Sequence, residues 1–138
     1  MIMKNEELPD YGPRDIDDEY FQEIYRADRV LARAEKGDPE AMYEMGKCFY
    51  FGEGRQENYR LALKFFLRPA EEGNASAQYY IGCIYEAGET EKEKEYKGVR
   101  QDHDEAAVWF AKAAALGHEE AAKALERLGA ARLNSREK

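Results

Sequence analysis

The stretch AMYEMGKCFYFG at residues 41–52 returns as AQYYIGCIYEAG at residues 77–88. A second pair follows, ALKFFLRPAEEG at residues 62–73 and AAVWFAKAAALG at residues 106–117. Alanines, aromatic residues and glycines fall at the same places in both copies, although the second copy carries additional residues between its two halves. A third copy starts at Gly117 and stops early. Repeats of this length usually form stacked arrays, and such arrays more often bind other molecules than transform them.

Each copy has the pattern of two helices joined by a loop. The apolar residues of its first half recur at spacings of four, as Ala41, Met45 and Phe49 do, which places them on one face of an α-helix. Glycines end that half, and a return helix is expected over about residues 58–72. Pro69 falls inside the return helix and removes a backbone hydrogen bond there, so we expect a kink or an early end in the last turn.

Two glycines lie inside the first helices of the copies, where glycine costs about 1 kcal/mol relative to alanine. Because Gly46 and Gly82 occupy the same place in the two copies, we expect a packing reason. A missing side chain lets a neighbouring helix approach closely. The largest side chains of the second return helix are Trp109 and Phe110, and both are predicted to lie in the core.

These patterns predict an all-α fold, an α/α superhelical solenoid of about three helical hairpins (six helices). We expect a flexible acidic arm over residues 1–14, a helical-repeat domain over residues 15–132 and a tail over residues 133–138. The parts predicted within the domain are, in order, an N-terminal capping helix (15–37), a repeat (38–73), a repeat (74–117) with a loop insertion (89–97), and a C-terminal capping helix (118–132).

Composition narrows the classes of partner. The chain has 138 residues, a formal net charge of −8 and 36% charged residues, and much of the negative charge lies in residues 1–24. An acidic chain repels phosphate backbones, which argues against nucleic-acid binding. No apolar run reaches the roughly 18–20 residues of a membrane span, and the first residues lack the apolar stretch of a secretory signal. We therefore expect a cytoplasmic protein without membrane contact, whose Cys48 and Cys83 are free thiols.

The repeated core can be written A-x-x-x-[MI]-G-x-x-[FY]-x-x-G, then G-x7-A-x-x-[FW]-F-x3-A-x-x-G. This pattern resembles the Sel-like repeat, a relative of the tetratricopeptide repeat with longer and more variable loops. The likeness covers roughly residues 27–129 and is closest over residues 98–102 and 106–114. The first copy is looser, because Arg68-Pro69-Ala70 stands where Lys-Ala-Ala is usual. The resemblance implies α/α superhelices that scaffold protein complexes, often in bacterial signalling, envelope or secretion-linked processes.

Some bacterial members of that family carry a disulfide within each repeat. Cys48 and Cys83 sit at non-equivalent places in the two copies and do not reproduce this pairing. The branch with penicillin-binding or β-lactamase activity is therefore disfavoured.

In such solenoids the first helix of each pair lines an inner groove. Beside its core stripe, a displaced face carries the side chains that we predict to bind a partner. In chain order these predicted groove residues are Tyr43, Lys47, Tyr50, Tyr79, Glu86, Lys123 and Arg127. Tyrosine offers a large contact area with a polar tip, which suits the capture of an extended peptide or a helix. The alternative is that the tyrosines only cover the groove side of the core.

The function predicted from these features is a non-catalytic protein–protein interaction adaptor or scaffold without a cofactor, which binds a protein or peptide in the groove. An immunity-type inhibitor of a toxin and a hydrolase acting on cell-wall-derived ligands are the alternatives. His103 and His118 are expected to be exposed residues at helix termini rather than catalytic or metal-binding groups. We expect a monomer or a weak dimer.

Overall fold

The computed structural model describes residues 28–53, 56–90 and 98–136. Residues 28–35 form the first described helix. The five helices that follow are α2 (Pro39–Phe51), α3 (Tyr59–Glu71), α4 (Ala75–Glu86), α5 (His103–Ala115) and α6 (Glu119–Arg136). Within these residues the fold is the predicted all-α solenoid with six helices. The predicted arm (1–14), the first part of the N-terminal capping helix (15–27) and most of the loop insertion (91–97) lie outside the described residues.

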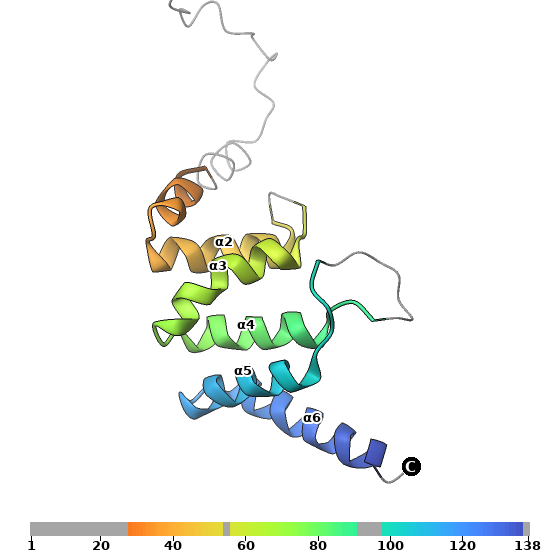
Figure 1. Cartoon of the computed structure of the whole chain (residues 1–138). Helices are drawn as coiled ribbons and strands as arrows, with labels where there is room; N and C mark the ends of the chain where they lie inside the picture. Colours follow the sequence, from red (N-terminus) through yellow and green to blue (C-terminus); the bar gives the residue numbers. More distant parts are fainter. Residues whose placement is uncertain (1–27, 54–55, 91–97, 137–138) are drawn as a thin grey trace, which may run out of the picture.

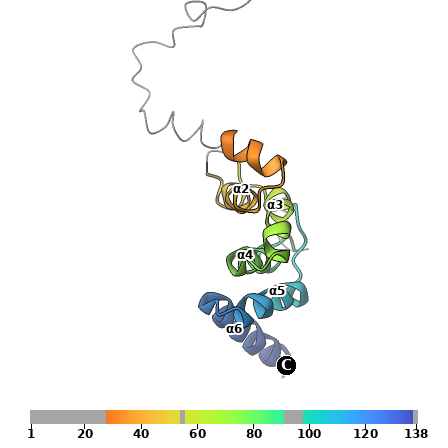
Figure 2. The ribbon, with the colours of Figure 1, turned by 90° about the vertical axis from the view of Figure 1, so that its left-hand side faces the viewer.

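The helices stack along one direction and form two rows. In Figures 1 and 2, α2, α4 and α6 make one row, and α3 and α5 make the other. The first helix of each pair therefore shares a side of the molecule with the first helices of the other pairs, as the repeat pattern predicts.

Each hydrophobic cluster is shared between a return helix and the first helix of the next pair. The central cluster combines Ala62 and Phe66 of α3 with Ala77 and Ile81 of α4. A second cluster joins α5 to α6, and a third joins the helix of residues 28–35 to α2 and to Phe65 of α3. No pair in the described residues buries its apolar side alone, which is the physical basis of a stacked array.

Two glycine–phenylalanine contacts hold the helix pairs together. A Cβ on Gly46 would lie 2.5 Å from the ring of Phe66, and one on Gly82 would lie 2.6 Å from the ring of Phe110. Both phenylalanines are fully buried. The glycines thus allow each return helix to approach closely enough for its phenylalanine to fill the core, which confirms the predicted packing reason.

Both return helices begin with a polar cap. The Asn58 side chain accepts a hydrogen bond from the Leu61 N–H at 3.0 Å, and the Asp102 side chain accepts one from the Glu105 N–H at 3.0 Å. Each cap satisfies one of the backbone donors that the first turn of a helix leaves unpaired.

The caps are also fixed to the preceding helix in the same way. The Asn58 N–H donates to the Phe49 carbonyl at 2.8 Å, and the Asp102 N–H donates to the Tyr85 carbonyl at 2.9 Å. In the second pair an isolated bridge between Glu89 and Arg100 joins the two ends of the longer loop. The insertion therefore leaves the start of α5 in the position that α3 has in the first pair.

Of the two outcomes predicted at Pro69, a kink or an early end, the structure shows the first: the helix α3 continues past Pro69 to Glu71, and Figure 1 shows it bending in its second half. Two other details differ from the sequence predictions. Trp109 lies half-buried at the edge of the central cluster rather than within it. The helix α6 reaches Arg136 rather than residue 132, since residues 133–136 continue the helical backbone.

Candidate interaction surface

The structure brings the predicted groove residues to one row of helices. Tyr43, Lys47 and Tyr50 lie on α2, Tyr79 and Glu86 lie on α4, and Lys123 and Arg127 lie on α6. Those on α2 and α4 are half-buried, and those on α6 are exposed. This placement follows from the repeat, because equivalent positions of stacked helices share a side of the solenoid.

Aromatic contacts connect α2 to α4 across this surface, with Tyr80 at their centre. Its ring stacks on Phe66 at 5.3 Å and lies 5.2 Å from Tyr50 and 6.4 Å from Tyr43. Phe51, which is 51% exposed, meets the ring of Tyr80 edge-on at 5.8 Å. Such tilted and edge-on ring pairs add to the stability that burial gives.

Sequence reasoning missed Tyr80 and Phe51. Tyr80 is equivalent to Glu44 in the first copy and to Ala124 in the third, so the repeat alignment gave no signal there. Its role arises from the distance between neighbouring helix pairs, which a pattern within one pair does not contain.

A thiol links the two tyrosine-bearing helices. Cys83 of α4 lies within hydrogen-bonding reach of the hydroxyls of Tyr50 and Tyr79. Burial raises the pKa of the Cys83 thiol, and burial also raises the pKa of Tyr79 to about 12. All three groups therefore stay protonated and neutral near pH 7, which suits a contact surface more than a reactive site. Neither Cys48 nor Cys83 forms a disulfide within the described residues.

An ion pair connects α4 to α6. The guanidinium of Arg127 donates two hydrogen bonds to the Glu86 carboxylate, and the bond between Nη2 and Oε1 measures 3.0 Å. The hydrogen bond to Glu86 raises the pKa of Arg127. Two parallel bonds fix the plane of both groups relative to each other.

His118 is less exposed than predicted. Its side chain is 16% exposed and its ring stacks on Tyr79 at 4.6 Å. The Nδ1 atom accepts a hydrogen bond from the Ala121 N–H at 3.1 Å, so His118 caps the start of α6. The position is equivalent to Asn74 before α4, which accepts the corresponding bond from the Ala77 N–H, and to Asp38 before α2, which accepts a bond from the Glu40 N–H two residues on. His103 is exposed at the start of α5, as predicted.

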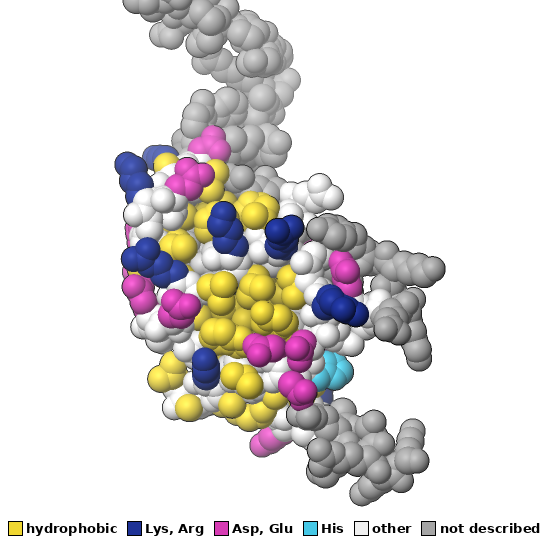
Figure 3. All heavy atoms as spheres, in the orientation of Figure 1, with side chains coloured by type: hydrophobic (Ala, Val, Ile, Leu, Met, Phe, Trp, Pro, Cys, Tyr) yellow, Lys and Arg dark blue, Asp and Glu magenta, His cyan; other side chains and the backbone are white. Residues whose placement is uncertain are grey.

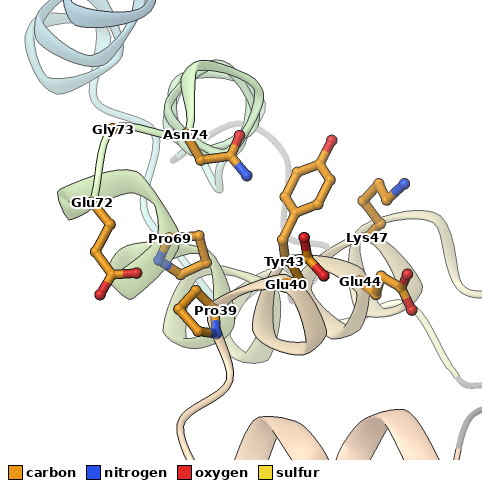
Figure 4. A pocket seen from close by; sticks show the side chains of 9 residues that line it. All are labelled: Pro39, Glu40, Tyr43, Glu44, Lys47, Pro69, Glu72, Gly73 and Asn74. Carbon is orange, nitrogen blue, oxygen red and sulfur yellow. The ribbon is translucent and has the colours of Figure 1, made fainter.

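One hollow opens beside Tyr43, where α2 faces the turn between α3 and α4. It is shallow, with a volume of about 680 Å³. In Figure 4 the Tyr43 side chain rises between Asn74 and Lys47, and Pro69 lies at the other end of the hollow. Lys47 places its ammonium 4.9 Å from the centre of the Tyr43 ring, which is a cation–π distance.

The charges around the hollow are mostly acidic. Glu40, Glu44 and Glu72 line it together with the single cation of Lys47. A hollow with an aromatic wall and an excess of carboxylates favours a cationic or amide side chain over an anionic one. Among the residues that the structure describes, no set of three His, Cys, Asp or Glu side chains is placed to hold a metal ion. None of the described helices is both long and apolar enough to cross a membrane.

The family model for the Sel1 repeat matches residues 39–74 and 75–118, which is more than half of the chain. The protein belongs to the Sel1-repeat family. The two matched Sel1 repeats are the α2–α3 and α4–α5 pairs, each taken to the turn that follows it. Proteins with Sel1 repeats generally act as scaffolds for protein–protein interactions.

Individual relatives agree with this assignment. The chain is 35% identical over 57 residues to the ERAD-associated E3 ubiquitin-protein ligase component HRD3A of Arabidopsis thaliana, over 41% of this chain and 8% of that protein. A crystal structure of a Sel1 repeat protein from Oxalobacter formigenes superposes with a TM-score of 0.65 at 30% identity, covering 76% of this chain and 28% of that one.

A protective antigen present in uropathogenic Escherichia coli strains, which displays an SLR fold, superposes with a TM-score of 0.64 at 25% identity. The alignment covers 80% of this chain and 21% of that one. The chain thus spans less than a third of each of these three relatives.

Proposed function

We propose that this Sel1-repeat protein is an adaptor that binds a segment of another protein along α2, α4 and α6. The segment lies across the aromatic contacts centred on Tyr80, and the hollow beside Tyr43 receives one of its cationic or amide side chains. The observation that supports this most is the hollow itself, because it joins an aromatic wall to carboxylates on the side where the predicted groove residues gather.

The contacts among the groove residues suit such a role. Ring pairs and the Glu86–Arg127 ion pair already hold the side chains of this surface in place. A surface that is ordered before binding loses less conformational entropy when the partner arrives. Tyrosines are common among the residues that contribute most to the binding energy of protein interfaces.

The proposal is tested by affinity capture from a lysate of the native host, followed by mass spectrometry and titration calorimetry of the captured protein. The test variants are Tyr43→Ala and Glu40→Lys, the second of which puts a cation where the proposal needs a carboxylate. Glu35→Lys, at the exposed end of the helix of residues 28–35, is the control with the same charge change. We expect the test variants to bind the captured protein at least tenfold more weakly. Equal affinity in test variants that melt like the wild type would refute the proposal.

The toxin-inhibitor and hydrolase alternatives stay predictions from the sequence, as do the cytoplasmic location and the oligomeric state. No contact on this surface favours any of them over a general adaptor.

A further inference from the structure

The opposite row of helices carries an apolar patch of its own. Leu63 of α3 and Trp109 of α5 both pack against the central cluster while remaining half-buried. Leu67 lies one turn after Leu63 and is 37% exposed, and Val108 precedes Trp109 and is 49% exposed. Figure 3 shows hydrophobic side chains gathered into one continuous patch over the α3, α4 and α5 region. We call Leu63, Leu67, Val108 and Trp109 the α3–α5 patch.

Cations border this patch along α3. Arg60, Lys64 and Arg68 follow one another at intervals of four residues, so they share one side of the helix, and all three are exposed. Arg68 has a loose contact with Glu72 at 3.9 Å. Neither Arg60 nor Lys64 has an ion pair within the described part of the chain. Figure 3 shows Lys and Arg side chains in dark blue beside the hydrophobic patch, over the part of this face where α3 lies.

The first turn of α5, at the other edge of the patch, has the opposite charge. Asp104 and Glu105 are exposed in the first turn of α5. Further along that helix, Lys112 places its ammonium 4.4 Å from the centre of the Trp109 ring. A stripe of three cations stands out in a chain with a formal net charge of −8, and it lies on one edge only. The cations on the α3 side and the carboxylates at the start of α5 set the orientation of any charged molecule that covers the patch.

We propose that the α3–α5 patch is a second docking surface, which binds a short amphipathic segment of another protein with acidic residues along one edge. The apolar side chains of that segment cover Leu67, Val108 and Trp109. Its carboxylates lie over Arg60, Lys64 and Arg68, and its other edge stays clear of Asp104 and Glu105. Charge complementarity selects this partner: the cations attract the acidic edge, and the acidic start of α5 repels a ligand that is negative on all sides.

This surface is independent of the one on α2, α4 and α6. The two rows of helices face away from each other in Figure 2, so both surfaces can be occupied at once. A protein that holds one partner on each row brings the two partners together, which is the physical meaning of a scaffold.

The single tryptophan of the chain makes the proposal directly testable, because Trp109 belongs to the patch. The full chain is used to select peptides from a random display library that contains no tryptophan. The enriched peptides are then titrated while the emission of Trp109 is recorded. We expect enriched peptides that combine apolar residues with a net negative charge, and a blue shift of the Trp109 emission on binding.

Variants of the patch and of other sites test whether the enriched peptides bind at the α3–α5 patch. Arg60→Glu with Lys64→Glu, and Leu67→Glu alone, should each weaken binding of the enriched peptides at least tenfold. Lys36→Glu and the groove variant Lys47→Glu should leave it within twofold. Circular dichroism and melting curves check that the helices of every variant are intact.

Several results would overturn the proposal. These are a library that yields no acidic binder, acidic binders that leave the Trp109 emission unchanged, or equal losses of their binding in Lys64→Glu and Lys36→Glu. Two further results would also overturn it in favour of another occupant. A shift of the Trp109 emission with protein concentration alone would indicate a second copy of this chain, and tighter binding of single-stranded RNA than of the peptides would indicate a nucleic acid.

Discussion

The α2–α3 and α4–α5 pairs are built on the same contact but differ around it. In both, a glycine of the first helix meets the phenylalanine ring of the return helix, and a polar cap fixes the start of the return helix. They differ in the connecting loop and in the last turn of the return helix, where the first pair has Pro69 and the second has Ala113. The contact within a pair is thus the fixed part of this fold, and the loop and the last turn tolerate change.

The largest expected effect comes from removing the shared contact. Phe66 and Phe110 are both fully buried, so Phe66→Ala and Phe110→Ala should each cost about 3–5 kcal/mol of unfolding free energy. Because Phe66 lies in the central cluster, its loss should lower the single unfolding transition. Phe110 joins α5 to the last helix, so its loss should let that end unfold first.

Urea denaturation checks both expectations, with circular dichroism for the helices and Trp109 fluorescence for the second pair. We expect the two probes to coincide for Phe66→Ala and to separate for Phe110→Ala. Coincident curves for Phe110→Ala would mean that the C-terminal end of the stack does not unfold separately from the rest, contrary to this expectation.

The second prediction concerns the glycine side of the same contact. Gly82→Ala improves helix propensity by up to about 1 kcal/mol, but its Cβ would meet the Phe110 ring at 2.6 Å. Overpacking typically costs about 1–3 kcal/mol, so after the gain in propensity we expect a net loss of up to about 2 kcal/mol.

Gly129 of α6 supplies the control, because nothing lies within 4 Å of a Cβ built on it. Gly129→Ala should stabilise the protein by up to about 1 kcal/mol. If both variants shift the urea midpoint in the same direction, propensity rather than the ring contact decides the cost at Gly82.

The third prediction exchanges the residues that distinguish the two last turns. Pro69→Ala restores a backbone donor inside α3 and removes about 3 kcal/mol of helix penalty. It also removes roughly two buried methylene groups, which are worth about 0.8 kcal/mol each. We therefore expect a net gain of about 1 kcal/mol, measured by urea denaturation.

Ala113→Pro is the matched reverse change in α5, and it should destabilise the protein by about 3 kcal/mol or more. A loss of stability in Pro69→Ala would show that the proline ring, which is fully buried, contributes more packing than this argument allows.

Residues within one helix pair were predictable from the sequence, and contacts between pairs were less so. The recurrence of Gly46 at Gly82 led to the ring contacts, and the spacing of Ala41 and Met45 led to the buried face of α2. Both are local or repeated signals. Tyr80 gave no signal, because its contacts with Tyr43 and Tyr50 depend on how one pair is rotated against the next.

His118 is a second residue whose contacts with a neighbouring helix were not predictable from the sequence. Its place after a helix-ending glycine suggested exposure, and only the neighbouring helix shows that its ring stacks on Tyr79. The α3–α5 patch is another feature that the sequence alone did not predict. Trp109 is aligned with Phe65, which is buried, so the exposed part of Trp109 could not be foreseen from the alignment.

The smallest expected effect lies in the caps that precede α4 and α6. Asn74→Ala removes the acceptor for the Ala77 N–H and should cost about 1 kcal/mol. His118→Ala removes both the cap of α6 and the stack on Tyr79, so it should cost as much or somewhat more. His118→Asn keeps a cap of the kind found at Asn74 and loses only the stack, so about 0.5 kcal/mol is expected. Thermal and urea denaturation of the three variants rank them. If His118→Asn proves as costly as His118→Ala, the ring contact with Tyr79 is the main contribution of this residue and the three caps are not equivalent.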